Sequence, residues 1–281
     1  MSTIVYLNGQ FLPQEAAHIS VMDRGFLFGD GVYEVVPVFK QKLFHPAAHL
    51  QRLQRSLNAV EIPFTVNEPE LTAIFNELLA RNTEAAGTQA IYLEITRGAE
   101  PQRSHIFPVN TQPTLFIYCF SVPTKSSAEM RQGAHAITID DIRWQWCFIK
   151  SINLLPNVLF AQRAKQSGAA EAILIRDGMA MEGTSSNLFI VKNEVLITPP
   201  ANEHILPGIT RDLMLELAAS NQIPYVEAPI STQALFQADE VWMTGSLKEI
   251  LPIVRIDDQV IGSGKTGVLC NRMIDLYEQN K

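Results

Sequence analysis

Residues 143–157 read R-W-Q-W-C-F-I-K-S-I-N-L-L-P-N. This stretch contains one lysine, Lys150, in a run that is otherwise rich in apolar and aromatic residues. Burial disfavours the charged form of a lysine, so such surroundings favour a neutral, nucleophilic amine. An amine of this kind forms Schiff bases with carbonyl compounds. A surface lysine beside a core strand is the commoner case, so the downstream sequence decides between the two interpretations.

Length, composition and charge narrow the class of protein. The chain has 281 residues, so one large or two medium domains are expected, and its 47% hydrophobic and 18% charged content is typical of a globular protein. The net charge of −7 argues against nucleic acid or an anionic membrane as a main partner. Residues 1–10 show no signal peptide, so we expect a cytoplasmic protein. The three cysteines lack metal-ligand spacing, so we expect reduced thiols and no metal.

The pattern of predicted elements indicates two domains. Residues 121–132 lack periodicity and contain Pro, Ser and Lys, so we interpret them as a linker between residues 1–120 and residues 133–281. Both parts mix strands and helices irregularly, which favours an α+β fold over a regular series of parallel strands and helices.

Local signals place the main elements. Turn residues between apolar runs predict hairpins at three dipeptides: Asn8-Gly9, Asp177-Gly178 and Asn193-Glu194. Apolar spacing of the helical type predicts five helices: residues 49–60, 70–86, 155–166, 209–221 and 268–279.

Several short motifs could carry chemistry. Glu182 begins E-G-T-S-S-N, and a carboxylate at a strand end can hold a pyridine nitrogen protonated. L-P-G-I-T-R at residues 206–211 starts a helix, where free amides can bind phosphate. T-G-S at residues 244–246 and Arg52 are further candidate phosphate contacts. For each motif taken alone, an ordinary turn, helix start or solvated helix face is at least as common.

A second group of residues could bind a carboxylate. Arg103 and His105, in R-S-H, lie at alternate positions of a long polar loop, and together they could clamp a carboxylate. Tyr33, in G-D-G-V-Y-E, could place a hydroxyl in a pocket. Alternatively, Arg103 and His105 are ordinary surface residues of the loop, and Tyr33 is only a residue of a strand.

Four pieces of sequence occur in a fixed order: D-R-G-F-L-F-G-D-G-V-Y-E, C-F-I-K-S-I-N-L-L, E-G-T-S-S-N-L-F and I-L-P-G-I-T-R. With R-S-H and T-G-S they span nearly the whole chain. The chain resembles the fold-type IV enzymes that use pyridoxal 5'-phosphate (PLP), and within them the D-amino acid (D-alanine) aminotransferases. The resemblance implies a smaller N-terminal α/β domain and a larger C-terminal domain with a β-barrel-like core. It also implies ping-pong transamination between a D-amino acid and a 2-oxo acid such as 2-oxoglutarate.

The resemblance also implies roles for single residues. Lys150 would form the Schiff base and act as the catalytic base, and Glu182 would face the pyridine nitrogen. Four groups would hold the cofactor phosphate: Arg52, the amides of Ile209 and Thr210, and Ser246. Ser185 and Ser186 would lie near the ring. The substrate carboxylate would meet Tyr33, Arg103 and His105, with the last two reaching the neighbouring subunit of a homodimer.

One departure and three competing functions accompany this interpretation. Gly245 and Leu247 stand where the D-alanine type has hydroxyl residues, which leaves only Ser246 in that part of the phosphate site. A branched-chain L-amino acid aminotransferase would typically have a tyrosine where Leu154 and Leu155 stand. An aminodeoxychorismate lyase would need room for a large ring, and R-S-H argues against it. A phosphate-binding protein without catalysis would not need both Lys150 and Glu182.

Overall fold

The computed structural model describes residues 3–83, 88–123 and 126–281, and the chain divides into two compact units. The first unit comprises residues 1–124 together with 149–153, and the second comprises residues 125–148 and 154–281. The segment that contains Lys150 therefore belongs to the first unit, although the prediction put it in the second domain. The reason is backbone pairing, because Tyr33 N donates to Lys150 O at 2.9 Å and Ile152 N to Gly31 O at 3.1 Å.

Half of the predicted linker, six of the twelve residues 121–132, lies in a strand or a helix rather than in an irregular connection. Its first residues end strand β6 (Thr114–Val122), and helix α4 (Ser127–Met130) follows. Ser126 and Glu129 form a capping box at the start of α4, a sequence signal that favours a helix. Residues 124–125 of the predicted linker lie outside the described residues.

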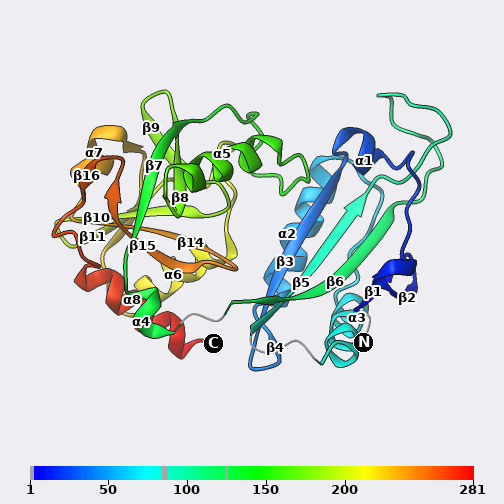
Figure 1. The fold of residues 1–281 in the computed structure, drawn as a ribbon, viewed down its shortest axis with the longest axis horizontal. Helices are drawn as coiled ribbons and strands as arrows, with labels where there is room; N and C mark the ends of the chain where they lie inside the picture. Colours follow the sequence, from blue (N-terminus) through cyan, green and yellow to red (C-terminus); the bar gives the residue numbers. More distant parts are fainter. Residues whose placement is uncertain (1–2, 84–87, 124–125) are drawn as a thin grey trace. The chain divides into compact units, whose positions relative to one another are not determined.

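A six-stranded antiparallel sheet forms the first unit, in the order β2-β1-β6-β5-β3-β4. Besides β6, its strands are β1 (Ile4–Leu7), β2 (Gln10–Pro13), β3 (Gly31–Phe39), β4 (Lys42–Leu43) and β5 (Thr88–Thr96). Helices α2 (Pro46–Ala59) and α3 (Glu68–Arg81) cover one face of this sheet (Figure 1). A short helix, α1 (Arg24–Phe28), precedes β3.

The two faces of this sheet differ because side chains alternate along each strand. Val32, Leu93 and Ile117 point toward α2 and α3, where they pack with Leu53 and Phe75 in one buried cluster. The alternate positions carry half-buried aromatic side chains, whose rings contact one another across neighbouring strands and along β6. These rings belong to Tyr33, Tyr92, Phe116, Tyr118 and Phe120.

The second unit is built on a ring of strands. In the order β10-β14-β15-β7-β8-β9, each strand pairs with the next, and β9 pairs back to β10. The ring strands are β7 (Ala134–Asp140), β8 (Glu171–Arg176), β9 (Met179–Gly183), β10 (Asn187–Lys192), β14 (Glu240–Gly245) and β15 (Glu249–Ile256). The expected β-barrel-like core is therefore confirmed. The ring closes through one residue pair between β9 and β10, Glu182 with Asn187.

Shorter strands and helices surround this barrel. The outer strands are β11 (Val195–Thr198), β12 (Tyr225–Glu227), β13 (Ile230–Ser231) and β16 (Gln259–Val260). The helices are α5 (Leu155–Gln166), α6 (Ile209–Ser220), α7 (Thr232–Phe236) and α8 (Val268–Gln279). Helix α5 packs on β7 and β8, whereas α6 and α8 pack on β14 (Figure 1). The three cysteines are free and buried.

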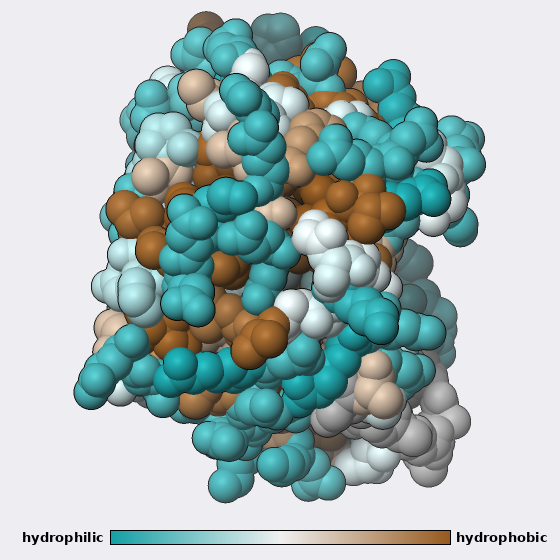
Figure 2. All heavy atoms as spheres, turned by 90° about the vertical axis from the view of Figure 1, so that its left-hand side faces the viewer, coloured by the Kyte–Doolittle hydropathy of each residue, from teal (hydrophilic) through white to brown (hydrophobic). Residues whose placement is uncertain are grey.

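Figure 2 shows one face on which hydrophilic residues cover most of the area, with smaller apolar patches between them. Within residues 3–83, 88–123 and 126–281, no helix combines the length and the hydrophobicity needed to cross a membrane.

Candidate active site

Lys150 lies beside the start of β3 in the first unit. Its backbone amide donates to Ser56 Oγ at 3.2 Å, and its Nζ lies 4.1 Å from the centre of the Tyr33 ring. The side chain is half-buried. The aromatic residues that precede it in sequence do not provide this burial, because Trp144, Trp146 and Phe148 are 40%, 56% and 38% exposed. The expectation that these preceding residues surround the Lys150 amine was wrong, because the aromatic ring beside the amine is that of Tyr33.

A buried charged group lies next to this lysine. The Glu34 carboxylate accepts hydrogen bonds from Arg52 Nε at 2.7 Å and from an Arg52 terminal nitrogen at 2.9 Å, and His49 Nδ1 lies 2.8 Å away. Burial alone would raise the pKa of Glu34, but Arg52 and His49 outweigh it and hold the pKa well below its usual range. Burial lowers the pKa of His49, and the nearby charges of Arg52 and Lys150 lower it further. Glu34 therefore stays ionised and fixes the guanidinium of Arg52.

Tyr33 belongs to the aromatic face of the first sheet. Its ring stacks on Tyr92 with 5.7 Å between centroids, and the Tyr92 hydroxyl donates to Glu94 at 2.6 Å. Glu94 pairs directly with Tyr33 across strands β3 and β5. Burial raises the pKa of the Glu94 carboxyl. The face on which Tyr33 lies thus presents stacked rings, the lysine amine and a carboxyl group.

The R-S-H loop is exposed and is held at its backbone. An Arg24 terminal nitrogen donates to the carbonyl oxygen of Ser104 at 2.6 Å, while Arg24 Nε binds Asp30 at 2.8 Å. The guanidinium of Arg103 lies 4.6 Å from the centre of the Phe28 ring, and the His105 ring contacts the same ring at 5.2 Å. Both side chains therefore lie against helix α1 and remain open to solvent.

Glu182 lies in the second unit, at the closure of the barrel. Its carboxylate is buried and accepts from Arg143 at 2.5 Å, from the Leu206 amide at 3.0 Å and from Asn187 Nδ2 at 3.2 Å. Burial raises the pKa of Glu182, and Arg143 with the Leu206 amide offsets only part of that rise. The carboxylate is thus fixed in position by three donors, one of them positively charged.

Arg143 connects Glu182 to a chain of charges. Two guanidinium nitrogens of Arg143 bind the buried Asp141 at 2.9 Å each, and Arg176 binds the same carboxylate at 3.0 Å. Arg176 in turn lies 2.9 Å from His204 Nδ1. Burial alone would lower the pKa of Arg143, but Asp141 and Glu182 raise it above its ordinary value. Arg143 therefore keeps its positive charge beside Glu182.

The start of α6 provides backbone amides for an anion. Gly208 is the N-cap and has no side chain to satisfy the first turn, where Ile209 and Thr210 follow. A Cβ at Gly208 would lie 2.0 Å from Asn187 Oδ1, so only glycine allows this approach. Asn187 also donates to Leu206 O at 2.8 Å. One asparagine thus links the Glu182 carboxylate to the helix start, where free amides and the helix dipole favour phosphate.

Two turns of the second unit lie next to the Glu182 strand. Ser185 is exposed in the turn between β9 and β10, whereas Ser186 is buried and donates to Glu171 at 2.6 Å. Ser246 is half-buried in the turn after β14. The preceding Thr244 is fully buried, and its hydroxyl has no hydrogen-bond partner among the described residues.

Sequence reasoning missed three residues of these groups: Glu34, His49 and Arg143. Glu34 is a charged residue inside an otherwise apolar strand, and His49 and Arg52 are three positions apart on one helix face, so both signals were present. Arg143 is the first residue of the stretch 143–157 that contains Lys150. None of the three could be paired from sequence, since their partners are distant along the chain.

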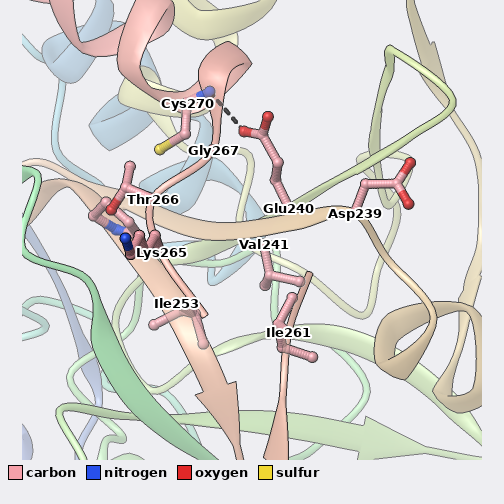
Figure 3. A pocket seen from close by; sticks show the side chains of 10 residues that line it. Asp239, Glu240, Val241, Ile253, Ile261, Lys265, Thr266, Gly267 and Cys270 are labelled. Carbon is pink, nitrogen blue, oxygen red and sulfur yellow. Dashed lines mark hydrogen bonds between the residues drawn. The ribbon is translucent and has the colours of Figure 1, made fainter. Parts of the chain in front are cut away.

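A small hollow lies elsewhere in the second unit, at the start of α8 (Figure 3). Its volume is about 10 Å³, which is room for a single water molecule. The Glu240 carboxylate accepts from the amides of Leu269 and Cys270 at 3.0 and 2.8 Å, so it already caps this helix. The residues that line the hollow include neither Lys150 nor Glu182.

The sequence matches the family model of amino-transferase class IV over residues 31–256. It is 40% identical over 265 residues to a D-alanine aminotransferase of Bacillus licheniformis, covering 94% of this chain and 92% of that one. A D-alanine aminotransferase of Staphylococcus epidermidis is 37% identical over 278 residues, covering 99% and 97%.

Solved structures of similar fold include branched-chain aminotransferases. That of Escherichia coli superposes with a TM-score of 0.90 at 26% identity, covering 99% of this chain and 94% of the other. The branched-chain aminotransferase of the thermophilic archaeon Thermoproteus uzoniensis, solved with norvaline, gives a TM-score of 0.88 at 26% identity, covering 99% and 94%.

Proposed function

The chain belongs to the class IV aminotransferases, and we propose that it transfers an amino group between a D-amino acid such as D-alanine and a 2-oxo acid such as 2-oxoglutarate. The observation that carries the choice of substrate is the 40% identity to a D-alanine aminotransferase along 94% of this chain. The branched-chain enzymes of similar fold are 26% identical. The R-S-H loop, with Arg103 and His105, also favours the D-amino acid.

The donor groups of the chain fit PLP as the cofactor. The free first turn of α6 at Ile209 and Thr210, together with Ser246 and Arg52, would hold the phosphate. Glu182 would bind the pyridine nitrogen, a role that suits a carboxylate fixed by Arg143 and two further donors. Ser185 and Ser186 would lie near the ring. When bound, PLP supplies an electron sink that stabilises negative charge at the substrate Cα.

Lys150 would carry the proton transfers. Its Nζ would accept the proton from the substrate Cα and donate it to the cofactor carbon within the same half-reaction, and the other half-reaction would run this transfer in reverse. The contact with the Tyr33 ring supports this role because it restricts where the amine can lie. Tyr33, Arg103 and His105 would bind the substrate carboxylate, and this placement would decide which hand of amino acid presents its Cα proton to the amine.

We also propose a cytoplasmic homodimer, in which Arg103 and His105 reach the site of the partner subunit. The outer face of α5 supports an interface, since Leu155, Val158 and Leu159 are 67%, 60% and 47% exposed on one side of the helix. The opposite side packs on β7 and β8 through Phe160 and Ala164. Exposed apolar patches mark interaction sites, and two-fold dimers are the commonest oligomers.

A panel of D- and L-amino acids with 2-oxoglutarate tests the substrate, scored by the stereochemistry of consumption and product. We expect D-alanine to be a good amino donor and the L-branched-chain amino acids to be poor ones. Efficient use of L-leucine or L-valine with no reaction of D-alanine would instead identify a branched-chain enzyme.

Replacement of Lys150 by alanine tests the catalytic assignment. We expect transamination to fall by several orders of magnitude, because removal of a group that both binds the cofactor and moves the proton is rarely compensated. Circular dichroism should show that the variant remains folded. In the wild type, bound PLP should give a visible absorption band that disappears on borohydride reduction, and the variant should lack this band. Retained turnover would contradict the role of Lys150.

A further inference from the structure

A buried carboxylate that the proposed function does not use lies behind the turn of residues 183–186. Glu171, the first residue of β8, is 1% exposed. Its Oε1 accepts from the Thr184 amide at 3.1 Å and from the Thr184 hydroxyl at 2.6 Å, and its Oε2 accepts from Ser186 Oγ at 2.6 Å. One carboxylate therefore organises the turn that follows Glu182.

The same carboxylate reaches a second turn. Lys248, in the turn between β14 and β15, forms an ion pair with Glu171 Oε2. Burial alone would raise the pKa of Glu171, but Lys248, Ser186 and Thr184 outweigh it and lower the pKa. The Glu171 carboxylate thus stays ionised, and its contact with Lys248 connects the turn of residues 183–186 to the turn of residues 245–248, in which Ser246 lies.

The two turns are also packed tightly against each other. A Cβ at Gly245 would lie 3.0 Å from the carbonyl oxygen of Ser185. A Cβ at Gly183 would lie 2.4 Å from Ser186 Oγ and 2.9 Å from the Glu171 carboxyl carbon. There is no space for a side chain at either glycine, so the backbones of the two turns approach closely. The Glu171–Lys248 pair joins the two turns at this spacing.

We propose that Glu171 and Lys248 are positioning residues, which fix the ring-side turn of residues 183–186 against the phosphate-side turn of residues 245–248. This inference rests on the proposed function, since it assigns both turns to PLP. The ring and the phosphate of PLP are joined by a short covalent link, so the two turns must lie at a fixed spacing. A site held at that spacing before binding loses less free energy to ordering and therefore binds more tightly.

Three variants test the pair: Glu171→Gln, Lys248→Met and the double variant. PLP affinity is measured by titrating the apoprotein and following absorbance, and the stability of each apoprotein is measured by urea denaturation. We expect each single variant to bind PLP about tenfold or more weakly, the size expected for a hydrogen bond to a charged group. The double variant should be no weaker than the worse single variant, because one interaction is lost in all three.

Two controls separate positioning from general stability. Lys248→Arg keeps the charge and should restore most of the affinity for PLP. Lys192→Met removes the Lys192–Asp239 ion pair, which lies in the same unit away from both turns, and should leave PLP affinity unchanged. Lys248 is only partly buried, so its variant keeps the test available if Glu171→Gln fails to fold.

The outcomes distinguish this inference from the proposed function. If the wild type binds PLP and Lys248→Met loses stability but not affinity, the pair is merely structural and the inference is overturned while the function stands. A Lys248→Arg variant as weak as Lys248→Met would also overturn it. A wild type that binds no PLP would overturn both the function and the inference.

Discussion

Buried charges occur in hydrogen-bonded groups in both units of this protein. Glu34 is held by His49 and Arg52, and Glu182 is held by Arg143. Removal of one partner from such a group leaves an uncompensated buried charge, which costs roughly 3–5 kcal/mol. These groups therefore restrict the positions of Arg52 and Glu182 as well as the substitutions that the chain can accept.

Glu34→Gln should destabilise the protein in a pH-dependent way. The pKa of Glu34 in the folded state is lowered, so its contribution to stability is complete above the unfolded value of about 4.5 and is lost as pH falls toward the folded value. At pH 7 we expect a loss of roughly 3–5 kcal/mol in the free energy of unfolding. Urea denaturation of wild type and variant at several pH values measures the difference, which should shrink below about pH 4.5. A difference that is independent of pH would contradict this account.

Motifs in the sequence singled out individual residues as candidates for the site. Lys150 and Glu182 lie in distinctive pieces of sequence, and the structure gives each a defined set of contacts. The surroundings of Lys150 were not predictable, because its sequence neighbours Trp144 and Trp146 face solvent while Tyr33 comes from a distant strand. Contacts between distant segments are set by the fold, and local sequence does not encode them.

The loop that carries R-S-H is the element with the clearest expected effect on substrate binding. Arg103→Ala combined with His105→Ala should raise KM for D-alanine about tenfold or more, because each side chain would provide a charge-assisted hydrogen bond to the carboxylate. PLP affinity should not change. Steady-state kinetics and PLP titration measure the two quantities, with the exposed neighbour Gln102→Ala as the control. An unchanged KM would remove these residues from the substrate site.

The start of α6 offers a steric test of the phosphate site. Gly208→Ala would place a Cβ 2.0 Å from Asn187 Oδ1 and push the helix start away from Glu182, so we expect PLP affinity to fall about tenfold or more. Gly168→Ala is the control, since no atom lies within 4 Å of its added carbon although its φ is +68°. That variant should lose stability without losing affinity for PLP. Equal affinities in both variants would contradict the assigned phosphate site.

At the level of elements, local signals were sufficient for most helices and hairpins. The predicted bounds of α5 and α8 agree with the structure, and the residues of the Asp177-Gly178 turn have the positive φ angles that such turns require. The predicted helix over residues 70–86 begins earlier, at Glu68, and ends at Arg81, and its residues 84–86 lie outside the described residues. Closure of the barrel was expected from the resemblance alone, because pairing of β9 with β10 through one residue pair leaves no local pattern.

Assembly of the whole molecule gives a prediction about α5. Val158→Glu places a charge in the exposed apolar face of this helix, so it should shift the proposed dimer toward monomer at micromolar concentration. Sedimentation velocity measures the shift. Val260→Glu is a matched control, because Val260 in β16 is 58% exposed and Val158 is 60% exposed. A dimer unaffected by Val158→Glu would place the interface elsewhere.

The pairing of residues 150–152 with the start of β3 has a consequence for synthesis of the chain. When a ribosome has released only residues 1–124, all strands from β1 to β6 are present, but the edge of β3 at residues 31–33 still lacks its partner. Such an open edge can associate with other nascent chains. The first unit is complete only after residue 153 has emerged, because residues 149–153, which include Lys150, belong to it.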